Sequence, residues 1–180
     1  MTVNSYKLSG KISNGSLFCQ AGQGALILNM DIKTTQEAFE KRAKEHIAHF
    51  YDNNEGVNKS IVLEFVECSA EEKKLVMKHV TNHGEANPLG SIHGGITAWL
   101  LDTAIGMVNI TYIGERATPT VSMSVNYIEP LFEGDEVIIT SWIDRIGKTL
   151  IAVHAECRVG GIVKATAIGT SFRLPPEKAF

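Results

Sequence analysis

Hydrophobic residues in the first third of the chain recur with the period of a helix. Between residues 34 and 51 they stand at steps of four, four and three, as Phe39, Ala43, Ile47 and Phe50. This spacing predicts an amphipathic helix. Thr34 and Glu37 have the spacing of a capping box, which would begin the helix at this point. His46 and His49 are expected on its surface.

From residue 60 onward the dominant hydrophobic period becomes two, the period of a strand. Strands are predicted at residues 60–67, 72–80, 121–127, 136–145, 149–158 and 162–173. Within 121–127, apolar and polar residues alternate, which indicates one buried and one more polar face. Gly147-Lys148 is expected to form a type II′ turn and Gly160-Gly161 a type I′ turn. These two hairpins predict an antiparallel sheet.

Residues 95–113 are too many for a strand and are apolar on every side, which predicts a helix buried all round. Asp102 is its only charged residue, and at the centre of a membrane span it would cost about 2.5 to 3.5 kcal/mol, so no membrane span is expected. Six strands that curl around this helix would bury most of it, and a second copy could cover the rest. The predicted fold class is α+β, with a curved antiparallel sheet wrapped around a central apolar helix.

Three segments are expected along the chain. Residues 1–33 form an N-terminal extension whose apolar run at 25–30 is either a short strand or packing material. Residues 34–59 hold the amphipathic helix and a linker, and residues 60–180 form the main domain. A length of 180 residues is enough for one domain with an appendage.

The composition narrows the function classes. Apolar residues make up 44% of the chain, as in a packed globule, and the formal charge is −3, so nucleic acid is not an expected partner. The three cysteines have no disulfide-like spacing and are expected to be free thiols. The first ten residues lack the pattern of a secretory signal, and a cytoplasmic location is expected.

Candidate chemistry is concentrated at the apolar helix. No other charge marks a solvent-facing stripe around Asp102, so we expect a buried carboxylate, which is costly unless it is hydrogen-bonded or functional. A long connection at residues 82–92 precedes His93, Gly94 and Gly95. The two glycine amides could approach a ligand at the positive end of the helix, as in an oxyanion hole. A tight turn capped by His93 is the structural alternative.

The distance between these groups has a consequence for assembly. Gly94 and Asp102 are eight residues apart, about 12 Å along a helix, whereas groups that act on one carbonyl lie within about 3 Å of the reacting atoms. If both act together, two antiparallel copies of the helix must face each other across a twofold axis. The enzyme hypothesis therefore predicts an obligate dimer with two sites at its interface.

The chain also resembles a known family. The residues that carry the resemblance are Asn87, Gly90, His93-Gly94-Gly95, Asp102, the segment 118–127, Pro130, Gly134-Asp135 and Gly147-Lys148. Over residues 60–172 they are similar to the hot-dog-fold acyl-CoA thioesterases of the phenylacetate-pathway type. The resemblance implies a hot-dog fold and hydrolysis of an acyl or aryl thioester, without a metal or redox cofactor.

The resemblance also implies roles for single residues. The Gly94 amide, oriented by His93, would polarise the thioester carbonyl. Asp102 of the partner subunit would act as general base on water or, alternatively, as nucleophile. Asn87 would bind near the thioester or the lytic water, and Thr120 would position the water or the carboxylate.

Substrate contacts and partners complete the expectations. Gly95 and Trp99 are candidate substrate-binding residues, although Trp99, like Leu100 and Met107, is equally expected in the core. Arg145, Lys148 or Arg173 would bind the CoA phosphates. We expect at least a homodimer and favour a homotetramer built as a dimer of dimers. The alternatives are a non-catalytic acyl-CoA-binding hot-dog module and a hot-dog enoyl-CoA hydratase. His79 and His83 have a metal-ligand spacing, but a strand pattern around His79 argues against a helical metal site.

Overall fold

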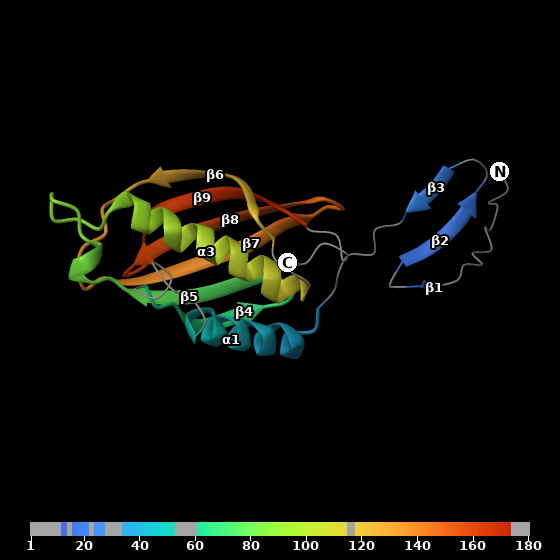
Figure 1. The fold of residues 1–180 in the computed structure, drawn as a ribbon, viewed down its shortest axis with the longest axis horizontal. Helices are drawn as coiled ribbons and strands as arrows, with labels where there is room; N and C mark the ends of the chain where they lie inside the picture. The colour runs from blue at the N-terminus through green and yellow to red at the C-terminus, as the bar shows by residue number, and fades with distance from the viewer. Residues whose placement is uncertain are drawn as a thin grey trace. The chain divides into compact units, whose positions relative to one another are not determined.

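The computed structural model describes residues 12–13, 16–21, 24–27, 34–52, 61–114 and 118–173. The chain divides into two compact units, Met1–Ile32 and Lys33–Phe180. In the first unit, β1 (Ile12–Ser13), β2 (Ser16–Ala21) and β3 (Gly24–Ile27) form a small antiparallel sheet in that order (Figure 1). Part of the apolar run at 25–30 therefore lies in a strand, and residues 28–30 lie outside the described residues.

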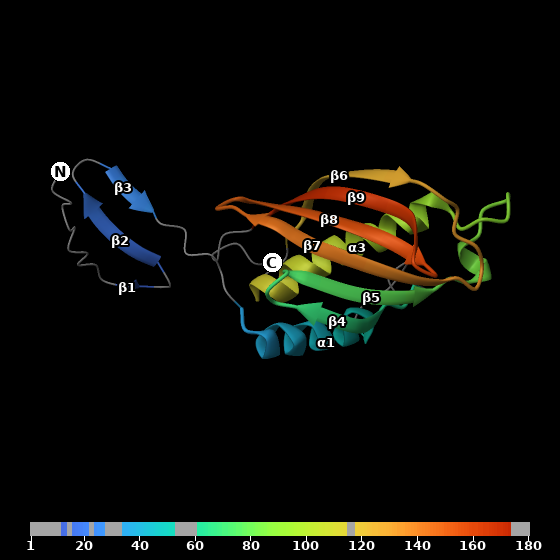
Figure 2. The same cartoon turned by 180° about the vertical axis from the view of Figure 1, so that it is seen from behind.

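The second unit contains a six-stranded antiparallel sheet with one long helix, α3 (Gly94–Ile113), along its concave face (Figures 1 and 2). Its strands are β4 (Glu64–Ser69), β5 (Lys74–Val80), β6 (Thr120–Tyr127), β7 (Glu136–Ile146), β8 (Leu150–Val159) and β9 (Ile162–Phe172). Their order is β4-β5-β7-β8-β9-β6, which leaves β4 and β6 as edges. The predicted α+β architecture, a curved antiparallel sheet around an apolar helix, is confirmed.

The core lies between α3 and the inner face of the sheet. Leu100, Leu101 and Ile105 of α3 are fully buried there. A Cβ atom at Gly169 of β9 would lie 2.8 Å from Ile105 Cδ1, so this glycine permits the close approach of helix and strand. The Ser141 hydroxyl of β7 donates a hydrogen bond of 3.0 Å to Ala104 O, which ties the middle of α3 to the sheet.

Within a single chain the sheet buries most of α3, as expected, but not all of it. One stripe of the helix remains partly exposed, formed by Gly95, Trp99, Asp102, Thr103, Gly106 and Ile110. The sequence pattern could not reveal this stripe, because its residues are mostly apolar or small. In the described part of the chain, α3 is the one helix long and apolar enough for a membrane span, and most of its apolar window is buried in the fold.

The helix α1 (Gln36–Asp52) confirms the predicted amphipathic helix and packs against α3 and β4. Its capping residue is Thr35 and not Thr34, because the Ala38 N–H donates to Thr35 Oγ1 at 3.2 Å. Arg42 donates hydrogen bonds to the carbonyls of Thr111 and Tyr112, at 2.6 and 3.0 Å. A cation at the C-terminal end of a helix is favourable, so Arg42 fixes α1 beside the last turn of α3.

Of the two predicted hairpin turns, the one at Gly160-Gly161 is confirmed and the one at Gly147-Lys148 is not. Gly160 and Gly161 have φ of +56° and +83°, as a type I′ turn requires, which confirms that prediction. Gly147 has no positive φ, so a type II′ turn that begins with Gly147 is wrong. Its N–H donates to Leu150 O at 2.8 Å, and Lys148 and Thr149 make the connection. A Cβ at Gly147 would lie 2.7 Å from Leu150 O, which explains the glycine.

Candidate active site

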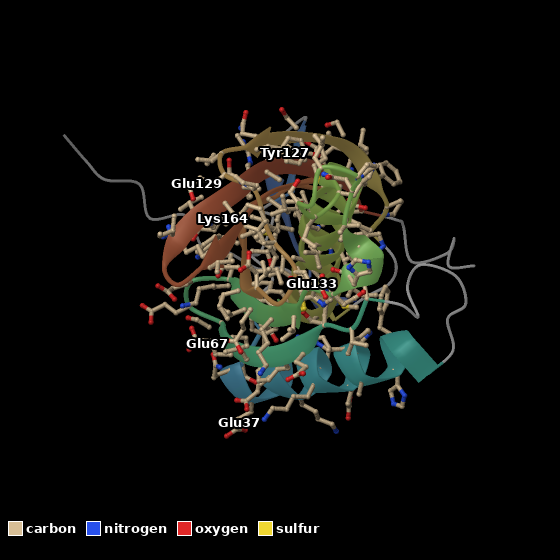
Figure 3. The ribbon with its side chains drawn as sticks, turned by 90° about the vertical axis from the view of Figure 1, so that its left-hand side faces the viewer. Glu37, Glu67, Tyr127, Glu129, Glu133 and Lys164 are labelled. Atoms are coloured by element: carbon tan, nitrogen blue, oxygen red, sulfur yellow. The ribbon has the colours of Figure 1, made fainter. Side chains whose placement is uncertain are left out.

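Three hydrogen bonds fix the first turn of α3. His93 is the N-cap residue, and its Nδ1 accepts a bond of 3.0 Å from the Gly95 N–H. The His93 N–H donates to Glu85 O at 2.8 Å. From the end of β6, the Tyr127 hydroxyl donates to Gly94 O at 3.0 Å. Figure 3 views the molecule from this end, with Tyr127 beside the first turn of α3.

These hydrogen bonds determine whether the N–H of Gly94 or that of Gly95 can bind a ligand. The Gly95 N–H is taken by His93 Nδ1, so Gly95 does not offer the free amide that the sequence led us to expect. Within the part of the chain that the structure describes, the Gly94 N–H has no hydrogen-bond acceptor. It lies at the positive end of a 20-residue helix dipole. A single backbone donor is thus available to a negatively charged or polarised oxygen.

Asn87 lies close to this donor but is engaged in its own loop. Its Nδ2 donates to Ser91 Oγ at 2.8 Å, and its Oδ1 accepts from the Leu89 N–H at 2.8 Å. Asn87, Gly94 and Tyr127 line a common cavity of about 350 Å³. Asn87 and Gly94 thus line one cavity, with the Asn87 side chain held by Leu89 and Ser91.

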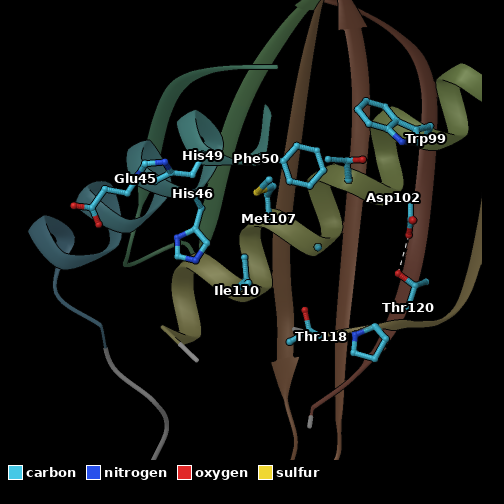
Figure 4. Close-up of a pocket in the computed structure, with 13 residues that line it drawn as sticks. Glu45, His46, His49, Phe50, Trp99, Asp102, Met107, Ile110, Thr118 and Thr120 are labelled. Carbon is cyan, nitrogen blue, oxygen red and sulfur yellow. Dashed lines mark hydrogen bonds between the residues drawn. The ribbon is translucent and has the colours of Figure 1, made fainter. Parts of the chain in front are cut away.

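Asp102 and Thr120 form the second part of the candidate site. The Thr120 hydroxyl donates a hydrogen bond of 2.7 Å to Asp102 Oδ1 (Figure 4). Asp102 is half-buried on the open stripe of α3, not enclosed in the core as expected. Its carboxylate faces a cavity of about 750 Å³. Trp99, a predicted substrate-binding residue, and Met107 line the same cavity, whereas Leu100 is a core residue.

Helix α1 supplies a wall of this cavity that the sequence did not reveal. Glu45, His46, His49 and Phe50 line it together with α3 and the start of β6 (Figure 4). His46, expected on the surface, is half-buried, and its Nδ1 lies 3.0 Å from Arg42 O. The helical spacing of these residues was visible in the sequence, but the docking of α1 beside α3 was not.

Within one chain the two parts of the site are separate. The cavity at Gly94 and the cavity at Asp102 share no lining residue. The two residues lie eight positions apart on one helix, about 12 Å along its axis. One copy of the chain therefore cannot bring both groups to a single carbonyl.

The basic residues expected at the CoA phosphates stand apart from both cavities. Arg145 and Lys148 are exposed and line neither of the two. Lys148 lies in the connection between β7 and β8, and the Arg173 N–H donates to Thr149 O in that connection at 2.8 Å. Among the described residues there is no group of three His, Cys, Asp or Glu side chains that could hold a metal ion.

Part of the chain is similar to known proteins. Residues 89–166 match the family model of the thioesterase superfamily, a span that contains His93, Gly94, Asp102 and Thr120. Acyl-coenzyme A thioesterase 13 of Mus musculus is 38% identical to this chain over 84 residues, which are 46% of this chain and 59% of that protein. The match thus spans about three fifths of this relative's length.

Solved structures share the fold. The PaaI protein of the E. coli phenylacetic acid degradation operon superposes with a TM-score of 0.66 at 20% identity, over 76% of this chain and 96% of that chain. A Streptococcus mutans protein bound to acetyl-CoA superposes with a TM-score of 0.57 at 22% identity, over 61% of this chain and 86% of that chain. The hot-dog fold expected from the sequence is confirmed.

Proposed function

We propose that this protein is an acyl-CoA thioesterase that hydrolyses an acyl or aryl thioester with water. The observation that carries the proposal is the presence of two groups on α3. The first is the N–H of Gly94, the first residue of the helix, and the second is the carboxylate of Asp102, eight residues later, which accepts a hydrogen bond from the Thr120 hydroxyl. A backbone donor at a helix N-terminus stabilises the oxygen of a tetrahedral intermediate, and a carboxylate can take a proton from water. The match of residues 89–166 to the thioesterase superfamily model and the similarity to the mouse thioesterase support it.

In the proposed reaction the Gly94 N–H polarises the thioester carbonyl, and Asp102 acts as general base on the attacking water. Thr120 holds the Asp102 carboxylate through its 2.7 Å hydrogen bond. His93 orients the first turn of α3 by accepting the Gly95 N–H, and Asn87 contributes to the cavity beside Gly94. Attack of Asp102 itself on the carbonyl is the alternative form of the chemistry. A thioester has weak carbonyl resonance and a good leaving thiolate, so a Ser or Cys nucleophile is not required.

We further propose that each site forms between two copies of the chain, with Gly94 from one and Asp102 from the other. Two arguments support this assembly. The separation of Gly94 and Asp102 on α3 argues against a site within one chain, and the open stripe of α3 around Asp102 leaves a face that a second α3 can cover. A dimer, or a tetramer built from two such dimers, meets this requirement.

The proposed substrate is a thioester of coenzyme A. The structurally similar Streptococcus mutans protein is bound to acetyl-CoA, which is such a thioester. In this proposal the acyl group lies in the cavity lined by Trp99, Met107 and Phe50. The phosphates would meet Arg145 or Lys148, whose exposed side chains lie outside both single-chain cavities. A cytoplasmic location is part of the proposal, since Cys68 and Cys157 are free thiols, as in a reducing compartment.

The test is thiol release from a panel of short, medium, long and aryl acyl-CoA esters, followed with a thiol-reactive dye. Wild-type protein is expected to release CoA from at least one class. Asp102→Asn should lower kcat by about 100-fold or more while acyl-CoA binding persists. Unchanged thiol release by Asp102→Asn would contradict the catalytic role. Binding without release by the wild type would instead indicate a binding module, and water addition to an enoyl-CoA without thiol release would indicate a hydratase.

A further inference from the structure

A buried pair of titratable side chains lies outside the proposed chemistry, next to the Gly94 end of α3. His79, near the end of β5, is 4% exposed, and Glu85, the last residue of the short turn η1 (His83–Glu85), is 5% exposed. His79 Nε2 lies 3.0 and 3.1 Å from the two Glu85 carboxylate oxygens. Burial of two ionisable groups is costly, so their place in the fold calls for a physical explanation.

Contacts on both sides of the ring hold the His79 imidazole in place. His79 Nδ1 lies 2.9 Å from Val62 O, and a carbonyl oxygen can only accept. Both ring nitrogens thus face acceptors, the Glu85 carboxylate on one side and Val62 O on the other.

Glu85 connects this buried pair to the first turn of α3. Its carboxylate also accepts hydrogen bonds from the Asn82 side chain and backbone, which close η1 as a capping box. Its main-chain carbonyl accepts the His93 N–H at 2.8 Å. The Glu85 side chain and carbonyl belong to one residue, so fixing the carboxylate fixes the acceptor that holds the N-cap residue before Gly94.

We propose that His79 and Glu85 are positioning residues that hold the Gly94 amide where the thioester carbonyl binds; this inference rests on the proposed thioesterase function. The pair does not touch the substrate and acts through Glu85 O and His93. A metal role for His79 is not supported among the described residues, because the His83 side chain is 88% exposed and pairs with Glu133 instead. The buried pair thus connects the end of β5 to the first turn of α3, where the Gly94 N–H lies.

The experiment compares Glu85→Ala, Glu85→Gln and His79→Gln in the full chain, with rates normalised to the folded fraction. Glu85→Ala should lower kcat by about 10-fold to 100-fold with little change in KM, since displacement of a remote support misplaces a reacting group. Glu85→Gln, which keeps the shape and an acceptor for His79, should recover part of this loss. Ile139→Val, a substitution in the buried core of β7, is the control for destabilisation alone and should leave kcat unchanged.

A second readout does not depend on activity. Amide NMR spectra of Glu85→Gln and His79→Gln should show shifted Gly94 and Gly95 signals, while the Gly160 and Gly161 signals stay in place. Wild-type kcat for Glu85→Ala together with unmoved Gly94 and Gly95 signals in both variants would overturn the inference. If the wild type releases no thiol from any ester, the proposed function fails, and the NMR shifts alone then decide whether the pair holds this corner.

Discussion

Thr120 at the start of β6 donates a 2.7 Å hydrogen bond to the carboxylate of Asp102 on α3. Hydrogen bonds to carboxylates are stronger than those between neutral groups, and this bond fixes one oxygen of a carboxylate that lines the larger cavity. The edge strand of the sheet thus orients the candidate base on the helix. This relationship joins two residues that are eighteen positions apart in the sequence.

Replacement of Thr120 by Val should test this orientation, because Val keeps the shape and removes the hydroxyl. We expect kcat for thioester hydrolysis to fall by about 10-fold, the equivalent of one hydrogen bond to a charged group. Thr120→Ser should retain most of the activity. Thr170→Val in β9, the same change away from both cavities, is the matched control. Thiol release at the wild-type rate by Thr120→Val would show that Asp102 does not depend on this bond.

Tyr127 supports the opposite end of the candidate site. Its hydroxyl donates to Gly94 O, and its ring would lie 3.5 Å from a Cβ at Gly94. Tyr127→Phe removes the bond and keeps the ring. We expect kcat to fall by about 3-fold to 10-fold, because a neutral hydrogen bond contributes about 0.5 to 1.5 kcal/mol.

The Tyr127 side chain is largely exposed, so the midpoint of denaturant unfolding should change little in Tyr127→Phe. Kinetics and denaturation of the same preparation separate the two effects. A variant with the full wild-type kcat would mean that the first turn of α3 needs no support from β6.

The sequence predicted those features that depend on local pattern. Helix α3, the strands and the Gly160-Gly161 turn follow from periodicity and from the φ that glycine permits. The proximity of Gly94 to Asn87, and of Asp102 to Thr120, was expected from the family resemblance.

Features that depend on tertiary contacts were not predictable in this way. Nothing local shows that Glu85 lies buried against His79, whereas a cap by His93 was one of the two alternatives that the sequence left open. The α1 wall of the larger cavity depends on Arg42, whose hydrogen bonds reach α3 residues about 70 positions later in the chain. The prediction of a type II′ turn at Gly147 was wrong. Glycine is needed there because a side chain would collide with the Leu150 carbonyl, and not because the backbone has a positive φ.

Cys157 predicts a specific dependence of stability on pH. Burial, with a smaller contribution from the Glu156 carboxylate, raises the pKa of its thiol from 9.0 to about 12. The folded state therefore holds the proton more tightly than the unfolded state. The stabilisation is complete below the unfolded pKa of 9.0 and is lost as the pH rises from there toward about 12.

Cys157→Ala removes this titration. The free energy of unfolding of the wild type should fall more steeply than that of Cys157→Ala between about pH 8 and about pH 10.5, measured by denaturant titration. Other groups that titrate in this range are common to both proteins, so the difference between the two curves isolates Cys157. Parallel curves would mean that the thiol ionises equally well in the folded state.

The account depends on cooperation between Gly94 of one copy and Asp102 of another. Gly94→Pro removes the amide hydrogen at the first position of α3, where proline is tolerated in a helix. The preceding residue, His93, has φ −61° and ψ 132°, the extended conformation that proline favours before it. Gly94→Pro and Asp102→Asn should each lower kcat by about 100-fold or more.

Thiol release by mixed oligomers of these two variants, formed by co-expression, is the most direct measurement. Random pairing makes half of the dimers mixed, and each mixed dimer has one site with an intact Gly94 and an intact Asp102. The mixture should therefore recover about one quarter of the wild-type activity, although neither variant is active alone. A mixture that forms mixed dimers but stays as inactive as its separate components would contradict a site shared between subunits.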